Sequence, residues 1–208
     1  MKRSYTGPLR HEPLAIELHN TLYAAGGELV DGLETADELS AWLAGIADRT
    51  PWPAGDGDAL RRADYVALRS AVREALRAGL DDEPIATSAL EVMNAIAARA
   101  PVSPLAVRSR DGQLRAHTRH HATDPTDVVL AAIAADAIEL LTGPRRQDVR
   151  ACRAPGCVLL FTLDHPRRSW CSPACGNRAR QARHYERRRL ARLGRAGAVP
   201  RTQSSSSS

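Results

Sequence analysis

All four cysteines of the chain stand in two short segments, Cys152-Arg-Ala-Pro-Gly-Cys157 and Cys171-Ser-Pro-Ala-Cys175. Thiolates are preferred ligands of a structural zinc ion, and closely spaced pairs allow each pair to come from one tight turn. Pro155 and Gly156 supply the residue types that favour such a turn between the first two cysteines. Four protein ligands also leave no open position for a catalytic water. The sequence therefore predicts one structural zinc ion bound by all four cysteines.

The spacing of these cysteines, C-x4-C-x13-C-x3-C, argues against other uses of clustered thiols. A redox catalyst would use Cys-x-x-Cys, and neither pair has that spacing. The intervals also differ from the ferredoxin patterns that bind iron–sulfur clusters. Two disulfide bonds would need an oxidising compartment, whereas we expect a cytosolic chain. His165 lies between the pairs and could replace one cysteine as a ligand, although a turn position is its simpler interpretation.

The residues around the cysteines predict a treble-clef finger. Apolar residues from Val158 to Phe161 precede Asp164-His-Pro166, and this pattern predicts two short strands and a turn before Trp170. Helix-forming residues follow from Asn177 to Leu193. A tight turn, a hairpin and a second cysteine pair that leads into a helix are the parts of a treble clef. We expect Phe161 and Trp170 to form its small core.

The segment from Cys152 to Arg189 resembles the CGNR zinc-finger family, whose name is the tetrapeptide that stands here at Cys175-Gly-Asn-Arg178. The four cysteines, Phe161 and Trp170-Cys171-Ser172 also match the family pattern. Many members carry a Ser-Arg-Asn-like segment before the tryptophan, where this chain has Asp164-His-Pro-Arg-Arg168. The resemblance implies that the finger binds DNA.

Members of this family pair the finger with a helical N-terminal domain of the ABATE type, which is associated with stress-induced transcription regulation. The likeness in this chain rests on His19-Asn20-Thr21 and on Asp31-Gly-Leu through Leu39-Ala-Trp-Leu43. The resemblance thus implies a transcription regulator with a separate helical domain in front of its finger.

The predicted helix after Cys175 carries arginine around most of its surface. Arginine suits phosphate contacts, each of which releases counterions, and one or two residues near the helix start could instead contact a base. The candidate nucleic-acid contacts are Asn177, Arg178, Arg180, Arg183, Arg187, Arg188, Arg189 and Arg192. We expect Ala179, Ala182 and Leu190 to pack on the finger or the body. As alternatives, Asn177 could shape the helix start and Arg178 could bond the finger's own carbonyls.

Charge divides the chain into two parts. Residues 145–208 hold 15 arginines and three acidic residues, whereas residues 1–144 hold 14 basic and 21 acidic residues, so the net charges are +12 and −7. A strongly basic C-terminal part predicts a polyanionic partner, with DNA first and RNA as the alternative. A disordered solubilising tail would explain the charge alone, but not its position beside every cysteine of the chain.

Residues 1–144 predict a mainly α domain that contains one β-hairpin. Apolar residues recur there at helical spacing in several segments. The helices are expected over Leu14–Leu22, ended by Gly26-Gly27; after the capping box Thr35-Ala-Asp-Glu38, with Leu39, Trp42, Leu43 and Ile46 buried; over Tyr65–Leu80; over Ile85–Ala97; and from Asp124-Pro125 to Leu141. Asp111-Gly112 favours a tight turn, so the hairpin is expected between Leu105 and Thr118. Pro51-Trp-Pro53 predicts a rigid loop.

Gly143-Pro144 ends the last helical pattern and places a domain boundary after residue 144. We expect the helical domain over 1–144, the finger with its basic helix over 145–196 and a disordered tail over 197–208. No apolar run is long enough for a membrane span, and the first 15 residues lack the apolar core of a signal peptide. The chain is therefore expected in the cytoplasm, without contact to a membrane.

The N-terminal domain is larger than a finger needs for stability, so we expect it to sense a small-molecule effector or to assemble a homodimer. His19 and Asn20 are its candidate ligand-binding residues, with a core hydrogen bond as the alternative. His117, His120 and His121 could form a second metal site, although a solvated loop is the simpler interpretation. Phosphate-binding glycine loops and the common hydrolase motifs are missing, so no enzyme is predicted. The alternative function is that of an RNA- or ribosome-associated zinc-finger protein.

Overall fold

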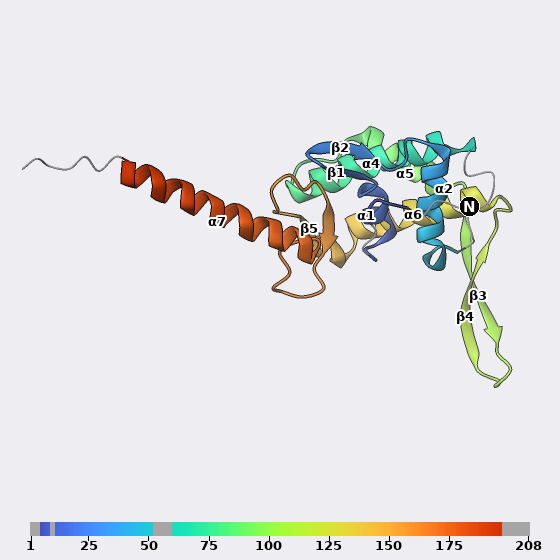
Figure 1. Ribbon diagram of the computed structural model, residues 1–208. Helices are drawn as coiled ribbons and strands as arrows, with labels where there is room; N and C mark the ends of the chain where they lie inside the picture. The colour runs from blue at the N-terminus through green and yellow to red at the C-terminus, as the bar shows by residue number, and fades with distance from the viewer. Residues whose placement is uncertain (1–4, 9–10, 52–59, 197–208) are drawn as a thin grey trace, which may run out of the picture.

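The computed structural model describes residues 5–8, 11–51 and 60–196 of the chain. Helices predominate in these residues, and three two-stranded antiparallel hairpins lie between them. A small finger follows the helical domain and continues into a long helix that runs away from the rest of the molecule (Figure 1). The predicted mainly α architecture is confirmed. Trp52 and Pro53 of the expected rigid loop, and the expected disordered tail over 197–208, lie outside the described residues.

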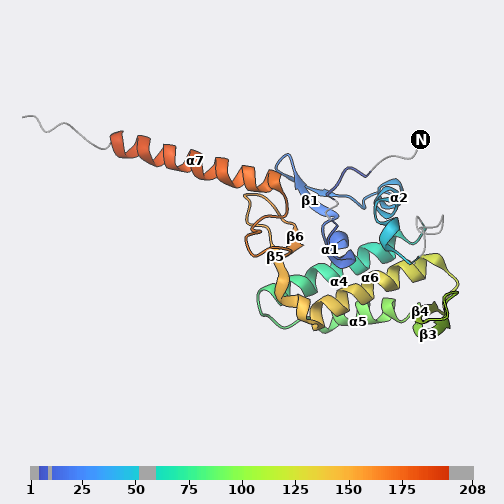
Figure 2. The same cartoon turned by 90° about the horizontal axis from the view of Figure 1, so that it is seen from below.

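Three long helices form the framework of the N-terminal domain. α4 (Arg62–Leu80), α5 (Thr87–Ala97) and α6 (Pro125–Thr142) pack side by side, and α1 (Leu14–His19) packs against α4 and α6 (Figure 2). Apolar residues at helical spacing place one continuous core between these helices. The Asp124 side chain accepts a hydrogen bond from the Thr126 N–H, which confirms it as the predicted cap of α6.

The predicted capping box begins α2 (Ala36–Gly45). The Thr35 hydroxyl accepts a hydrogen bond from the Glu38 N–H, and the Glu38 carboxylate accepts one from the Thr35 N–H. The helix buries Trp42, whose ring meets Tyr65 of α4 edge-on with centroids 6.5 Å apart. α2 thereby covers one side of the core, and the 3-10 turn η1 (Ala47–Arg49) follows it.

The first helix is shorter than the sequence predicted. α1 ends at His19, and the chain continues as β1 (Leu22–Ala25) and β2 (Glu28–Asp31), which Gly26 and Gly27 join. Both glycines have a positive φ, 61° and 91°, which is the conformation of a tight hairpin turn. The glycine pair therefore reverses the chain instead of ending a helix. The N-terminal domain contains two hairpins rather than the one expected.

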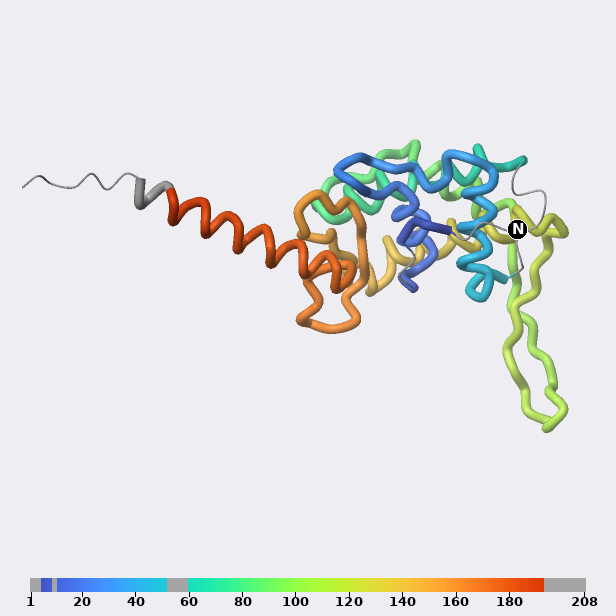
Figure 3. The backbone as a smooth tube through the Cα atoms, in the orientation of Figure 1, coloured from blue at the N-terminus to red at the C-terminus, as the bar shows by residue number. Residues whose placement is uncertain are grey.

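The other hairpin of this domain is the predicted one. β3 (Val102–Arg108) and β4 (Leu114–His120) pair over their whole length, and Asp111-Gly112 lies in the turn between them. Gly112 has a φ of 82°, as a tight turn requires. The hairpin projects from the helical domain at the end of the molecule remote from the long C-terminal helix (Figure 3).

The finger begins after the 3-10 turn η2 (Pro144–Asp148). Its two strands are β5 (Val149–Ala151) and β6 (Leu160–Thr162), which pair across the first two cysteines. The sequence placed both strands between the two cysteine pairs, and only β6 lies there. The partner strand comes earlier because Val149 and Leu160 both enter the core of the helical domain, whereas the residues after β6 are largely polar.

The long helix α7 (Pro173–Ala196) begins between the last two cysteines, earlier than the expected start at Asn177. Proline suits the first position of a helix because its missing N–H would have no partner there. None of the helices in the described ranges is both long and apolar enough to cross a membrane.

Candidate metal centre and basic helix

The four cysteine sulfurs form one compact cluster, with all Sγ atoms within 4.8 Å of one another. Cys157 Sγ lies 3.8 Å from both Cys171 Sγ and Cys175 Sγ, and the last two sulfurs are 3.4 Å apart. A zinc ion with four Zn–S bonds of about 2.3 Å places its sulfurs about 3.8 Å apart in a tetrahedron. All four thiols are free and none is at disulfide bonding distance. The cluster therefore fits one structural zinc ion.

Two local structures hold the sulfurs in place. Cys152 ends the β5 side of a tight turn, in which its N–H donates to the Leu159 carbonyl and the Cys157 N–H donates to the Ala154 carbonyl. Gly156 has a φ of 70°, so the turn needs the glycine that the sequence supplies. The second pair lies at the start of α7, where helical geometry fixes the position of Cys175. This combination is the treble clef that the sequence predicted.

Hydrogen bonds within the cluster distribute the protons among the thiols. The pKa of Cys152 is lowered because its sulfur accepts hydrogen bonds from the thiols of Cys157 and Cys171. The pKa of Cys157 is raised to about 11, chiefly because its thiol donates to Cys152. A zinc ion must displace the remaining thiol protons, so zinc affinity should fall as the pH falls.

Arg178 contacts the metal centre itself. Its guanidinium Nη2 donates to Cys175 Sγ at 3.3 Å, while the residue as a whole remains exposed to solvent. A hydrogen bond to a metal-ligating atom holds that ligand in its orientation. The predicted local role, a bond to the finger's own carbonyls, is thus replaced by a bond to one of its sulfurs.

The glycine and the asparagine of the Cys-Gly-Asn-Arg segment have local contacts as well. A Cβ atom on Gly176 would lie 3.2 Å from Cε3 of Trp170, so the absence of a side chain lets the indole pack on the first turn of α7. The Asn177 side chain accepts a hydrogen bond from the Arg180 guanidinium. Both residues shape the start of the helix, and for Asn177 this is the local alternative that the sequence left open.

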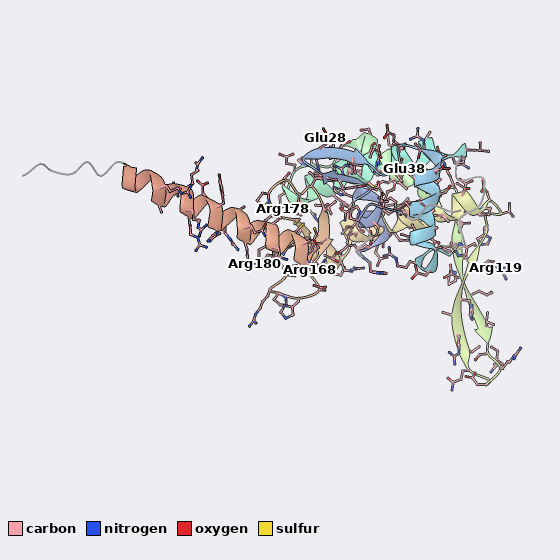
Figure 4. All side chains as sticks on the ribbon, viewed as in Figure 1. Glu28, Glu38, Arg119, Arg168, Arg178 and Arg180 are labelled. Carbon is pink, nitrogen blue, oxygen red and sulfur yellow. The ribbon has the colours of Figure 1, made fainter. Side chains whose placement is uncertain are left out.

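Beyond its first turns, α7 extends away from the other described residues of the molecule (Figure 1). Every side chain from Arg180 to Arg192 is exposed, and Figure 4 shows side chains along this part of the helix. All the candidate nucleic-acid contacts are therefore accessible to a partner: Asn177, Arg178, Arg180, Arg183, Arg187, Arg188, Arg189 and Arg192. Within the described part of the chain, only Arg189 among them has an acidic partner, Glu186 at 3.2 Å.

The expected packing of the small apolar residues of α7 is only partly correct. Ala179 is buried in the core of the finger, as predicted. Ala182 is exposed and Leu190 is 56% exposed, so neither packs on the finger or the body. The helix leaves the finger after Ala179, and its side chains from Arg180 to Arg192 are exposed with respect to the described part of the chain.

Asn20 joins the helical domain to the finger. Its amide nitrogen donates to the Leu160 carbonyl and its amide oxygen accepts from the Leu160 N–H, both at 2.9 Å. The side chain is fully buried. These contacts agree with the core hydrogen bond that the sequence offered as the alternative to ligand binding.

A second polar contact between the two parts escaped the sequence analysis. The buried carboxylate of Glu12 accepts hydrogen bonds from the Thr162 N–H at 2.8 Å and the Thr162 hydroxyl at 2.7 Å, and pairs with Arg168 at 2.7 Å. Arg168 also donates to the Cys171 carbonyl and lies over the Phe161 ring, 4.8 Å from its centroid. Glu12 and Arg168 thus link the helical domain to the backbone of a zinc ligand.

His19 lies beside this interface. Its Nδ1 is 3.1 Å from the Asn20 amide oxygen, and its Nε2 is buried without a hydrogen-bond partner among the described residues. Burial, together with the nearby charge of Arg73, lowers the pKa of His19 to about 3. The imidazole is therefore neutral at physiological pH and supports the orientation of Asn20.

The three histidines near the end of β4 do not form a metal site. The only cluster of metal-ligating side chains within the described residues is the group of four cysteines. His121 instead contacts the Ser103 hydroxyl through Nε2 at 2.8 Å. The solvated alternative for these histidines agrees with this arrangement.

A helical domain with a four-cysteine treble clef defines a zinc-binding protein of the zinc-finger class. The ABATE family model, described as "Putative stress-induced transcription regulator", matches residues 12–144, and the chain belongs to this family. The CGNR zinc finger model matches residues 149–188. No curated protein matches the chain. The predicted order of an ABATE domain and a CGNR finger is confirmed, and both families indicate a regulatory zinc-binding protein.

Proposed function

We propose that this protein is a DNA-binding transcription regulator whose α7 helix contacts the phosphate backbone. The observation that carries the proposal is the exposed run of α7 from Arg180 to Arg192, in which only Arg189 has an acidic partner among the described residues. Unpaired arginines spread around a helix suit phosphates on both sides of a groove. The zinc centre supports this role because it fixes the root of the helix against the finger.

The finger and the helical domain have different roles in this proposal. Residues 145–196 form the finger, whose helix α7 contacts DNA, and residues 1–144 sense a small-molecule effector or assemble a homodimer. The protein acts in the cytoplasm as a binding protein rather than an enzyme. The contacts of Asn20 and Glu12 with β6 support this division, because a change in the helical domain would reach the finger through them. RNA is the alternative partner, since the charge of α7 alone suits any polyanion.

The direct test measures binding of the full chain to a labelled duplex as a function of salt. In an Arg187→Ala/Arg188→Ala variant, the slope of log K against log salt should become shallower by about 1.8, because each phosphate contact contributes about 0.9. The matched control is Arg77→Ala/Arg145→Ala, which removes the same charge from exposed positions outside α7. Wild-type binding that is indifferent to salt would overturn the proposal.

Sequencing of the nucleic acid that crosslinks to the protein separates DNA from RNA. Enrichment of a few promoter sites supports the regulator, and palindromic sites also support a homodimer. Enrichment of ribosomal or transfer RNA supports the alternative function and contradicts the DNA proposal.

A further inference from the structure

The β3–β4 hairpin, residues Val102–His120 and called the arm below, contributes little to the fold of the domain that carries it. It extends away from the helical bundle at the end remote from α7 (Figures 1 and 3). In the part of the chain that the structure describes, none of its residues belongs to a hydrophobic core, and its two strands pair chiefly with each other. An isolated two-stranded hairpin is marginally stable at best in water. The arm therefore presents surface for a partner without strengthening the core.

The charge of the arm is opposite to that of its domain. The arm holds four arginines and one acidic residue, whereas residues 1–144 as a whole hold 14 basic and 21 acidic residues. The one acidic residue, Asp111, is paired with Arg115 at 3.0 Å. Arg110 and Arg119 have no acidic partner in the described part of the chain, and Figure 4 shows Arg119 on the arm. A protruding basic element on an acidic domain indicates a polyanionic partner.

The alternation of the strand places polar side chains in a row. Arg115, His117 and Arg119 share one face of β4, and consecutive members of the row are about 6.8 Å apart in an antiparallel strand. All three side chains are exposed. Their partners across the ladder include Leu105 and Val107, which are half-buried. The face thus offers charged and hydrogen-bonding groups beside apolar side chains of the neighbouring strand.

We propose that the arm enters the major groove of duplex DNA and forms a second DNA contact of this protein. The major groove of B-form DNA is about 12 Å wide and accepts a two-stranded β-ribbon. The corresponding groove of an A-form RNA helix is too deep and narrow for side chains to contact its bases. A second copy of the arm is a poorer partner than DNA, because the arginines of the two arms would repel each other. In addition, Pro104 has no N–H with which an added strand could pair.

The inference rests on the proposed function only in sharing DNA as the partner. It uses different residues, in a different domain, from those of α7. Contacts at both ends of the molecule would make the footprint on DNA longer than the finger alone could cover.

The test measures salt-dependent binding of the full chain to the labelled duplex with an Arg110→Ala/Arg119→Ala variant. These two side chains are exposed and unpaired, so the variant should keep the fold and the zinc content of the wild type. We expect the slope of log K against log salt to become shallower by about 1.8 and the hydroxyl-radical footprint to shorten. Arg77→Ala/Arg145→Ala is again the control with equal loss of charge.

The outcomes separate the two proposals. The slope and footprint could stay unchanged in the arm variant while the Arg187→Ala/Arg188→Ala variant loses affinity. This result overturns the proposal that the arm binds DNA and leaves the α7 proposal standing. The reverse result overturns the proposal that α7 contacts DNA and supports the proposal that the arm does. An equal loss on A-form duplex RNA would overturn the assignment to the DNA major groove.

Discussion

The helical domain and the finger are held together in different ways. The core of the helical domain contains large apolar side chains such as Trp42, Tyr65 and Leu68, which are fully buried. The buried core of the finger consists of seven residues, of which three are cysteines. Apolar burial can stabilise the first region without a ligand, whereas the second has too little apolar surface to do so. The finger therefore depends on zinc and on its polar contacts with the helical domain.

The largest expected effect comes from removing one zinc ligand. A Cys175→Ser variant should lose its zinc, because a structural site needs its full set of thiolates, and the finger should unfold while the helical domain stays folded. Zinc content and far-UV circular dichroism measure the two parts. Ala174→Ser changes an exposed neighbour between the ligands and should retain zinc. A Cys175→Ser chain with full zinc occupancy would contradict the comparison.

The contacts of Asn20 and Glu12 with β6 are called the joint between the two regions below. Loss of the Asn20 side chain should weaken this joint. Asn20→Ala leaves the N–H and the carbonyl of buried Leu160 without partners, at a cost of about 1–3 kcal/mol for each group. Urea unfolding should show this loss, and hydrogen exchange should accelerate at β6. Asn94→Ala removes an exposed amide from α5 and serves as the control. Equal unfolding free energies of the two variants would mean that the joint contributes nothing to stability.

Acid should act on the same joint through His19. The folded protein keeps His19 neutral down to a pKa of about 3, whereas the unfolded chain binds a proton near pH 6.5, about the ordinary value. The contribution is complete above the unfolded pKa and is lost as the pH falls toward the folded pKa. Between pH 7.5 and pH 5, the wild type should lose about 2 kcal/mol more unfolding free energy than a His19→Gln variant. The same loss in both proteins would show that His19 does not titrate on unfolding.

The smallest expected effect concerns the hairpin that the sequence did not predict. Gly27 has a φ of 91°, so a Gly27→Ala variant should lose about 1 kcal/mol of unfolding free energy to strain. Gly45, at the exposed end of α2, lacks a positive φ, and Gly45→Ala should be neutral or slightly stabilising. Chemical denaturation of both variants checks the difference, and equal midpoints would argue against the turn.

Local signals in the sequence predicted much of the helical domain. The capping box at Thr35 and the Asp124-Pro125 start of α6 satisfy backbone groups within a few residues. The local sequence is therefore enough to identify both helix starts. Gly26-Gly27 is ambiguous by comparison, because glycine can end a helix or form a hairpin turn with equal ease.

The zinc ligands were also predictable, because their spacing reflects a local geometry. The joint was not, since Glu12 and Thr162 are separated by 150 residues and meet only in the folded chain. The exposure of Leu190 was missed for a related reason. A helical pattern shows which residues share a face, but not whether any surface lies opposite that face.

Hydrogen exchange with and without zinc tests the contrast between the two regions most directly. After chelation of zinc from the full chain, exchange should rise across β5, β6 and the first turns of α7, while α4 and α6 keep their protection. Restored zinc should reverse the change. A finger that stays protected without zinc, or equal loss of protection in both regions, would contradict the account.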